Sequence, residues 1–316
     1  MQKAVLQKKR YRTFNDELRE TFGEKVWRIG VDAGFTCPNI NGTKGSGGCI
    51  YCNNEDLIQR KKIQNLSVRE QLLSRMEPLR EKRNAKKFLA YFQPYTNTYA
   101  PVEQLRKIYE EALTVDDIAG MSISTRPDCL PDDVIELLSE FSQKTYLWVE
   151  VGLQSAHNKT MEATNRLHTV EDFSDCIRRL KEKNLRVCMH LIYGLAGETL
   201  DDMNETMNFA AALPIDGIKI HNIYVSKHTI LEQWFYDGKF QPIEKEKYVQ
   251  LVCDTLEKLS PDVVIHRLTA EAPPRQHVAP DWCGNKADVL SCIDKEMEKR
   301  GTYQGVKYRE VCDGPA

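Results

Sequence analysis

The sequence predicts an α/β fold around a parallel sheet, which either closes partly into a barrel or lies open. Short apolar or β-branched runs alternate with segments that carry helix-start signals, from about residue 26 to about residue 260. Strands that alternate with helices pair in parallel through right-handed crossovers. No linker rich in Pro, Gly or Ser interrupts the alternation, so we expect one core domain with its site beyond the carboxyl ends of the strands.

Six strands are expected in this core, each a short run of apolar or β-branched residues. They are Val26–Phe35, Lys87–Phe92, Gly120–Thr125, Tyr146–Gln154, Arg186–Tyr193 and Gly217–Val225. The sequence also indicates where the intervening helices start. Ser67 opens a capping box, Pro101 and Pro131 suit first helical turns, and Thr169 and Thr199 each precede acidic residues that favour a helix start.

Two shorter segments flank the core, which we place at residues 26–260. Residues 1–25 predict a basic, helical lead-in. Residues 261–316 predict a C-terminal extension that closes the barrel, with one further strand, Val263–Leu268, and a helix, Lys286–Arg300.

Composition narrows the class of protein. The 316 residues are 41% hydrophobic and 28% charged, and no apolar run approaches the roughly 20 residues that span a bilayer. The first residues lack the apolar centre of a secretory signal, so we expect a cytoplasmic protein without a membrane partner. Ten cysteines in that compartment predict reduced thiols rather than a disulfide framework.

The strongest local signal is a cysteine loop directly after the first strand. It reads CPNINGTKGSGGCIYC and contains Cys37, Cys49 and Cys52. Glycines and asparagines between the cysteines let backbone wrap closely and present N–H groups, which the sulfurs of an iron–sulfur cluster need. Three cysteines hold such a cluster with one iron open to a further ligand.

Two other interpretations of the loop remain open. A zinc site would need a fourth ligand, for which Cys283 and His190 are the distant candidates. Alternatively, the three thiols are unrelated buried side chains.

The loop and five further segments resemble the radical S-adenosylmethionine (SAM) superfamily. The segments are YFQPYTNTYA, STRPDCLP, VEVGLQSAHNKTMEATNRLH, HLIYGLAGET and DGIKIHNIYV, together with GFTCPN and GGCIYCN around the cysteines. They are similar to the subclass with a long first cysteine spacing, as in the Elongator catalytic subunit and coproporphyrinogen dehydrogenase, and to the YhcC/YtqA group within it. The resemblance implies a partial (βα)6 parallel barrel and covers nearly the whole chain.

The same resemblance implies the cofactors. Cys37, Cys49 and Cys52 would bind three irons of a [4Fe–4S] cluster, and SAM would chelate the fourth. Reduction of the cluster by an electron donor such as flavodoxin or ferredoxin would cleave SAM to a 5′-deoxyadenosyl radical, with the cofactor supplying the chemistry and the protein positioning it.

The resemblance also places individual residues near SAM. Tyr51 would lie beside the adenine, and Gln93 is a candidate for the SAM amino group. Gln154 and Arg166 would reach the ribose and the carboxylate, since the fork of an Arg binds two carboxylate oxygens at once.

A strand and a turn supply the other cofactor candidates. Glu150 shares a strand face with Gln154, and an acid in an apolar strand needs a polar partner or a site to serve. His190 stands where related proteins carry an acid for the ribose hydroxyls. Gly194 and Gly197 belong to a segment that resembles the family's turn after the fifth strand, with Ala196 in place of the usual proline, and the resemblance implies that the backbone of this turn meets the adenine.

Lys219 and His221 are substrate-side candidates, and a C-terminal group is expected to close the pocket. That group is His266, Arg267, Arg275 and Cys283. The sequence assigns no catalytic side chain.

Three functions are compared. The resemblance implies a tRNA substrate, with wobble uridine converted from the carboxymethylaminomethyl towards the aminomethyl form, and a downstream methyltransferase. The alternatives are a radical SAM enzyme for a small molecule or protein side chain, and a non-catalytic, zinc-stabilised RNA-binding protein. The net charge of −2 does not favour RNA. A basic rim around the cluster is nevertheless expected from Lys8, Lys9, Arg10, Arg12, Lys61 and Lys62.

Overall fold

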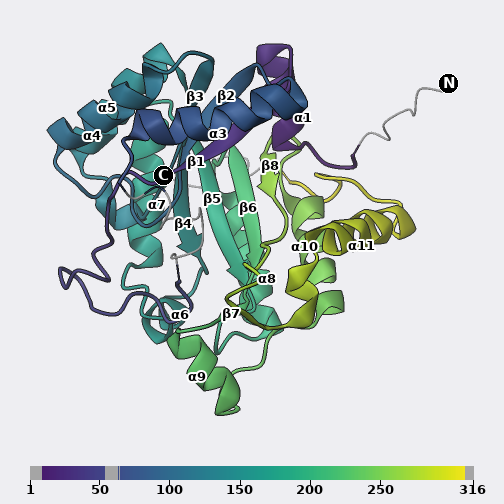
Figure 1. The fold of residues 1–316 in the computed structure, drawn as a ribbon. Coiled ribbons are helices and arrows are strands. Elements are labelled where there is room, and N and C mark those ends of the chain that lie inside the picture. The colour runs from purple at the N-terminus through teal and green to yellow at the C-terminus, as the bar shows by residue number, and fades with distance from the viewer. Residues whose placement is uncertain (1–8, 54–62, 64, 310–316) are drawn as a thin grey trace.

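The computed structural model describes residues 9–53, 63 and 65–309. Seven parallel strands form one curled sheet in the order β1-β2-β3-β4-β5-β6-β8 (Figure 1). They are β1 (Val26–Val31), β2 (Lys87–Phe92), β3 (Ile118–Thr125), β4 (Tyr146–Gln154), β5 (Arg186–Tyr193), β6 (Gly217–Asn222) and β8 (Val264–Arg267). The predicted partial parallel barrel is confirmed, and the strand expected in the C-terminal extension extends it by one.

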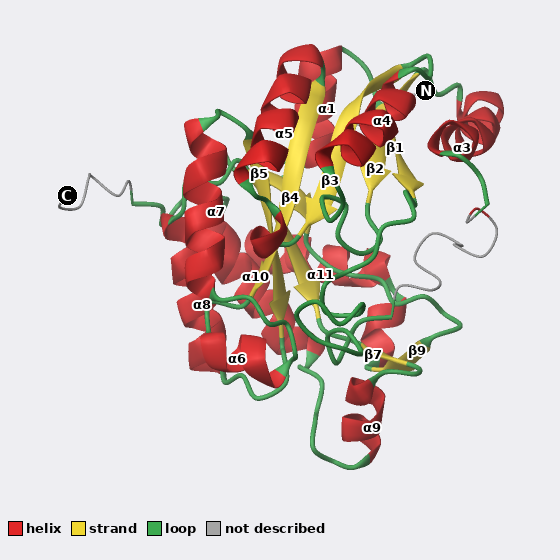
Figure 2. Cartoon of the chain, turned by 90° about the vertical axis from the view of Figure 1, so that its left-hand side faces the viewer, coloured by secondary structure: helices red, strands yellow, loops and turns green. Residues whose placement is uncertain are grey.

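Helices cover the outer face of the sheet (Figure 2). Those that follow strands are α3 (Val68–Arg83), α4 (Val102–Leu113), α5 (Asp132–Lys144), α7 (Val170–Glu182), α8 (Leu200–Ala212) and α10 (Lys245–Lys258). Capping boxes start α3, α7 and α8, at Ser67, Thr169 and Thr199. Buried apolar side chains of these helices and of the strands form the main hydrophobic core.

Smaller elements complete the fold. They are α1 (Phe14–Phe22), α6 (Asn158–Ala163), α9 (Ile230–Tyr236), α11 (Lys286–Lys299), the 3₁₀ turns Pro127–Cys129 and Asp281–Gly284, and a two-stranded antiparallel sheet of β7 (Val225–Ser226) and β9 (His277–Ala279). Figures 1 and 2 both place α9 at the end of the molecule beyond β7. Within the described ranges, every helix is too short or too polar to cross a bilayer.

Two strands end earlier than predicted, for local reasons. β1 stops at Val31 because the Gly34 amide donates to the Asp32 carboxylate at 2.9 Å and Gly34 adopts a φ of 77°, which bends the chain into the cysteine loop. β6 stops at Asn222, whose side-chain oxygen accepts from the Ala270 amide at 2.8 Å. The cysteine loop therefore begins at the carboxyl end of the first strand.

Candidate active site

The cysteine loop is anchored through asparagine side chains to the segment after α6. Asn39 is fully buried, and its amide nitrogen donates to the carbonyls of Asn165 and Arg166 at 2.6 and 2.9 Å. Asn165 returns the contact by donating to the Gly48 carbonyl at 2.7 Å. Because both bonds are to backbone atoms, they fix the path of the loop around Cys49.

Arg166 lies against this loop. One guanidinium nitrogen is 4.0 Å from the sulfur of Cys49, and another donates to the Gly152 carbonyl at 3.2 Å. Burial disfavours the charged form of Arg166, but the neighbouring Cys49 thiol and Tyr51 phenol outweigh that cost and raise the pKa of Arg166. The Nε atom of Arg166 is buried without a hydrogen-bond partner, so the guanidinium retains a free donor beside the cysteines.

Gln154 and Arg166 meet over Gly152. A Cβ atom placed on Gly152 would lie 2.4 Å from Gln154 Nε2 and 2.8 Å from an Arg166 terminal nitrogen. Gln154 itself has a φ of 79°, which non-glycine residues rarely adopt, at a point where the β4–β5 register shifts. A glycine thus makes room for two polar side chains, and strained backbone of this kind gathers at functional sites.

The turn after β5 packs on the same loop. Leu195 and Ala196 share a small apolar cluster with Ile50 and with the partly buried ring of Tyr51. Gly194 and Gly197 have φ values of 85° and 84°. The turn predicted to meet the adenine therefore lies against the Cys49–Cys52 segment, while Gln93 follows β2 directly and is half-buried.

The inner face of the sheet carries a buried polar cluster centred on Glu150. One carboxylate oxygen accepts from the Lys219 ammonium, from Ser124 at 3.1 Å, and lies 3.0 Å from His190 Nε2. Burial disfavours the Glu150 carboxylate, but the Lys219 ammonium and the two histidines His190 and His266 outweigh that cost and hold its pKa well below the ordinary value. Glu150 thus finds the polar partner that its place in an apolar strand required.

The neighbouring histidines are neutral. Burial, followed by the charge of Lys219, lowers the pKa of His190 to about 4, and burial lowers that of His266 to about 3. Lys219 also donates to the Tyr91 hydroxyl at 2.8 Å.

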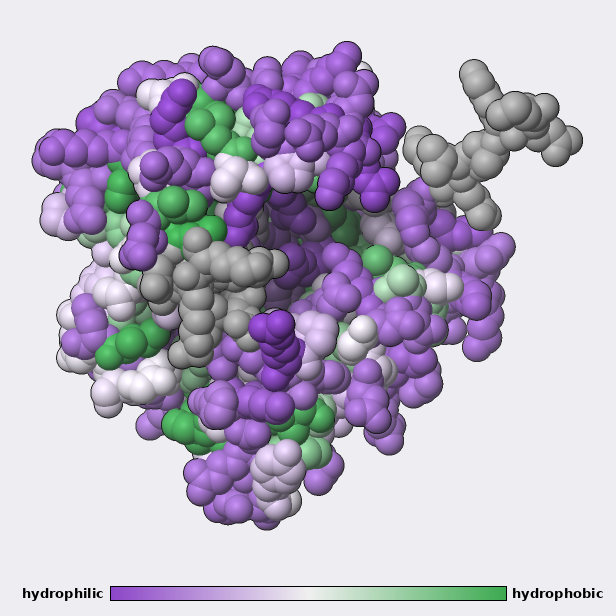
Figure 3. All heavy atoms as spheres, in the orientation of Figure 1, coloured by the Kyte–Doolittle hydropathy of each residue, from purple (hydrophilic) through white to green (hydrophobic). Residues whose placement is uncertain are grey.

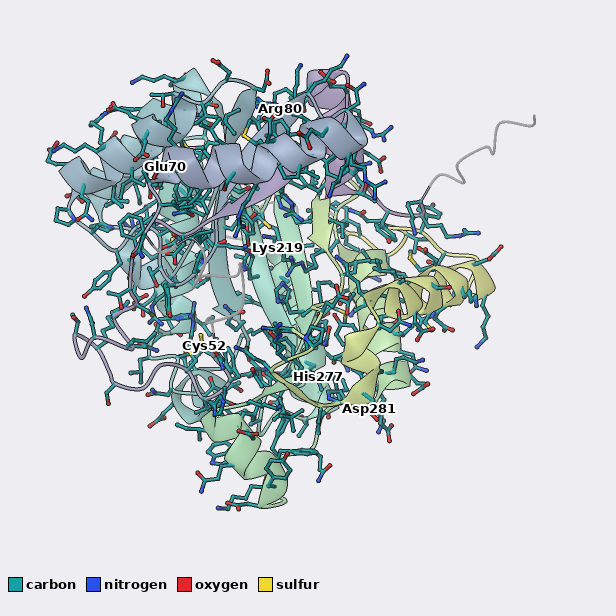
Figure 4. The ribbon with its side chains drawn as sticks, in the orientation of Figure 1. Cys52, Glu70, Arg80, Lys219, His277 and Asp281 are labelled. Carbon is teal, nitrogen blue, oxygen red and sulfur yellow. The ribbon has the colours of Figure 1, made fainter. Side chains whose placement is uncertain are left out.

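Figure 4 places Lys219 in the middle of the sheet and Cys52 nearer the carboxyl ends of the strands. Figure 3 shows the same face hollowed near its centre, with hydrophilic residues around the hollow.

Arg126 and Asp128, which follow β3, form a salt bridge. Two guanidinium nitrogens of Arg126 each lie 2.9 Å from an Asp128 oxygen, and Lys44 of the cysteine loop reaches Asp128 at 2.6 Å. This pairing fastens the loop to the end of β3.

The predicted basic rim is wrong for Arg12. Arg12 lines a cavity with Trp148, Arg186 and Val264, at the amino ends of their strands and so opposite the cysteine loop. It pairs with Glu17 at 2.6 Å, and Lys9 pairs with Asp294. Lys8, Lys61 and Lys62 lie outside the described residues.

The donors of the loop suit an iron–sulfur cluster. Cys37 and Cys49 are buried, Cys52 is exposed, and all three are free thiols. Asn39 Nδ2 lies 3.8 Å from the Cys49 sulfur, as expected for a polar group near a cluster ligand. Cys37 and Cys49 both lie close enough to Arg166 to contribute to raising its pKa.

A zinc site receives less support. Among the described residues, no three His, Cys, Asp or Glu side chains are close enough to ligate one ion. Cysteines that each bind a different iron of a cluster need not meet that requirement. The two proposed fourth ligands are engaged elsewhere, Cys283 with Asn222 at 2.8 Å and His190 with Glu150.

Sequence reasoning missed the anchoring roles of Asn39 and Asn165. The signal available was an Asn directly after Cys-Pro, which marks a turn but not its distant partner. Of the C-terminal group, His266 lies 3.7 Å from Glu150 and Arg267 lies 3.4 Å from His221, so these two join the inner cluster.

Comparisons with known proteins agree with this geometry. The model of the radical SAM superfamily matches residues 42–210, and that of the radical SAM C-terminal domain matches residues 215–299. The chain is 43% identical over 306 residues to YtqA of Bacillus subtilis, covering 96% of this chain and 94% of YtqA. It is 35% identical to YhcC of Escherichia coli K12 over 289 residues, covering 91% and 92%.

Two more distant matches are a sequence relative that is named as a tRNA-modifying enzyme and a solved structure with a similar fold. A tRNA uridine(34) acetyltransferase of Dehalococcoides mccartyi is 28% identical over 172 residues, covering 52% of this chain and 37% of that protein. The solved structure of Elp3 from Methanocaldococcus infernus superposes with a TM-score of 0.66 at 21% identity, covering 88% of this chain and 64% of that chain. The family models and the two close relatives together show that this chain belongs to the radical SAM superfamily.

Proposed function

We propose that this radical SAM enzyme acts on tRNA and converts a wobble uridine from the carboxymethylaminomethyl towards the aminomethyl form. The observation that supports the cofactor half is the meeting of Arg166 and Gln154 over Gly152, next to Cys49. When bound, a [4Fe–4S] cluster on Cys37, Cys49 and Cys52 would supply reductive cleavage of SAM.

The chain's own residues would bind and orient SAM. Arg166 keeps an unpartnered nitrogen for a carboxylate, and Gln154 offers an amide at the same point. Tyr51, within the Cys49–Cys52 segment, packs near the turn after β5 that contains Gly194 and Gly197, and an adenine would pack against Tyr51 and this turn.

Other SAM contacts are proposed with less structural detail. Gln93 stands at the end of β2 and is assigned to the SAM amino group. Glu150 and His190 hold each other at 3.0 Å, so they would reach the ribose as a linked pair rather than singly. Flavodoxin or ferredoxin would supply the electron, and a methyltransferase would take the product.

The proposal that the substrate is tRNA is supported by sequence similarity to a tRNA-modifying enzyme. The similarity to a tRNA uridine(34) acetyltransferase covers half of this chain, and the matched part includes less than half of that protein. The ion pairs of Lys9 and Arg12, at a distance from the cysteine loop, favour instead the second candidate, a radical SAM enzyme for a small molecule or protein side chain.

Two measurements test the proposal. Mass spectrometry of tRNA nucleosides from a strain lacking the gene should show carboxymethylaminomethyluridine accumulating. The reconstituted protein, with SAM and a reductant, should convert that nucleoside in tRNA, and the Cys52→Ala variant should not. If SAM is consumed while no wobble nucleoside changes, the tRNA assignment fails and the second candidate stands. If reconstitution yields no iron–sulfur cluster, the result would favour the alternative of a zinc-stabilised RNA-binding protein.

A further inference from the structure

The two edges of the half-barrel are bridged by α1. Thr13 pairs with Ile265 of β8, and α1 contacts both β1 and β8. Between these elements and α11 lies a cavity of about 320 Å³. We call it the seam cavity; its charged side chains are Arg28 of β1, Arg267 of β8 and Lys286 of α11.

The three cations of the seam cavity lack ion-pair partners. Among the described residues, no carboxylate lies within ion-pair distance of Arg28, Arg267 or Lys286, and no acidic residue lines the cavity. By contrast, the buried cations Arg126 and Lys219 are paired, with Asp128 and Glu150 respectively. Unpaired, partly desolvated positive charges in one cavity favour an anionic ligand.

Unused hydrogen-bonding groups point the same way. One terminal nitrogen of Arg28 is buried with no partner. His266, which also lines the cavity and is 7% exposed, has Nδ1 3.7 Å from Glu150 and Nε2 without a hydrogen-bond partner. Burial, and then the charges of Arg267 and Arg28, lower the pKa of Lys286, with Glu271 opposing. An oxyanion would use the free donors and relieve the mutual repulsion of the cations.

We propose that Arg28, Arg267 and Lys286 form a subsite for a carboxylate of the substrate. This inference rests on the proposed function and identifies the group recognised. The carboxymethyl carboxylate is the anion that the substrate nucleoside has and the aminomethyl product lacks, so a subsite for it would bind substrate in preference to product. An Arg fork engages both oxygens of a carboxylate.

Arg267 links the seam cavity to the inner polar cluster around Glu150. It lies 3.4 Å from His221, whose ring stacks on His190 with centroids 6.0 Å apart. The apolar walls, which include Phe14, Leu18 and Leu290, suit one small oxyanion group better than an extended phosphate backbone.

The test compares two anticodon stem-loop RNAs that differ only in the wobble nucleoside, one with carboxymethylaminomethyluridine and one with aminomethyluridine. Binding to the reconstituted protein with SAM is measured without reductant, so that nothing is turned over. Wild type should bind the carboxylated RNA about tenfold or more tighter, as a charge-assisted hydrogen-bonded group predicts. Arg267→Gln and Lys286→Met should each remove most of that preference without weakening binding of the aminomethyl RNA.

Two variants serve as controls. Lys286→Arg keeps the charge and should keep the preference. Lys295→Met removes an exposed charge from the same helix, α11, and should change nothing. Equal binding of the two RNAs by wild type, or a preference that survives in Arg267→Gln, overturns the subsite and leaves the proposed function standing. Equal weakening of both RNAs by Arg267→Gln also overturns it, because the contact would then be to a phosphate.

If the proposed function is wrong, the wild-type protein would bind neither RNA. In that case the subsite is tested separately, by titrating the protein with acetate in place of chloride at constant ionic strength. Acetate should raise the melting temperature of wild type and not that of Arg267→Gln. The same melting response in both proteins would remove the subsite.

Discussion

The guanidinium of Arg166 lies 4.0 Å from the Cys49 sulfur while it also donates to the Gly152 carbonyl at 3.2 Å. These contacts join the cysteine loop, which follows β1, to the end of β4 across more than a hundred residues of chain. One side chain therefore lies against both the proposed cluster ligand and the proposed SAM pocket. A substitution of Arg166 can thus show whether SAM binding is lost while the fold is kept.

Replacing Arg166 with Ala should weaken SAM binding by about tenfold to a hundredfold, the range for loss of a charge-assisted contact. Arg166→Lys should recover little, because an ammonium cannot form the two-pronged contact. Equilibrium dialysis with labelled SAM on the reconstituted protein measures both. Arg106→Ala, which removes a partly exposed Arg that pairs with Glu140, is the matched control and should bind SAM normally. Unchanged SAM affinity in Arg166→Ala would remove this residue from the pocket.

Replacing Cys52 with Ala should abolish SAM cleavage, by more than about a hundredfold, because the cluster loses one of three ligands. Cys52 is exposed, so the fold should be unaffected. Iron content and 5′-deoxyadenosine release are the measurements. Cys292→Ala on α11 is the control and should retain both. Full cleavage by Cys52→Ala would contradict the ligand assignment.

The sequence identified the cysteine loop because its chemistry is local: three thiols and the flexible residues between them are adjacent in the chain. The strand–helix alternation likewise predicts the parallel sheet from short-range patterns. Glu150 shows where such reasoning ends. Its need for a partner was evident, but Lys219 is 69 residues away and meets it only through the register of β4, β5 and β6.

Contacts between polar side chains and backbone atoms far away in the sequence could not be predicted either. Asn39 resembles an ordinary turn residue in the sequence, whereas the fold buries it against the carbonyls of Asn165 and Arg166. The prediction of a basic rim failed at Arg12 for a similar reason. Arg12 is near β1 in the chain, but the segment before α1 pairs in parallel with the start of β8, which places Arg12 at the amino ends of the strands.

Gly152→Ala should impair SAM binding with little effect on folding. The new methyl group would displace the flexible ends of Gln154 and Arg166, which can move at small cost. Gly120→Ala is the instructive comparison, because its methyl group would lie 2.1 Å from the backbone oxygen of Tyr146 and must disrupt the β3–β4 pairing. Chemical denaturation and SAM binding should therefore separate the two variants. Normal SAM affinity in Gly152→Ala would show that the meeting of Gln154 and Arg166 is not used by the cofactor.

Replacing Lys219 with Met should cost about 3–5 kcal/mol of unfolding free energy, because it leaves the fully buried Glu150 carboxylate without its ammonium partner. Glu150→Gln in the same chain should recover a large part of that loss, since the neutral amide no longer needs a counter-charge. Denaturant unfolding of the wild type, the two single variants and the double variant gives the coupling energy directly. Lys239→Met, which breaks the exposed pair with Asp237, is the control and should change stability by less than about 1 kcal/mol. If the losses of the single variants simply add in the double variant, Lys219 and Glu150 are not energetically coupled, and the pair would not be what stabilises charge inside the half-barrel.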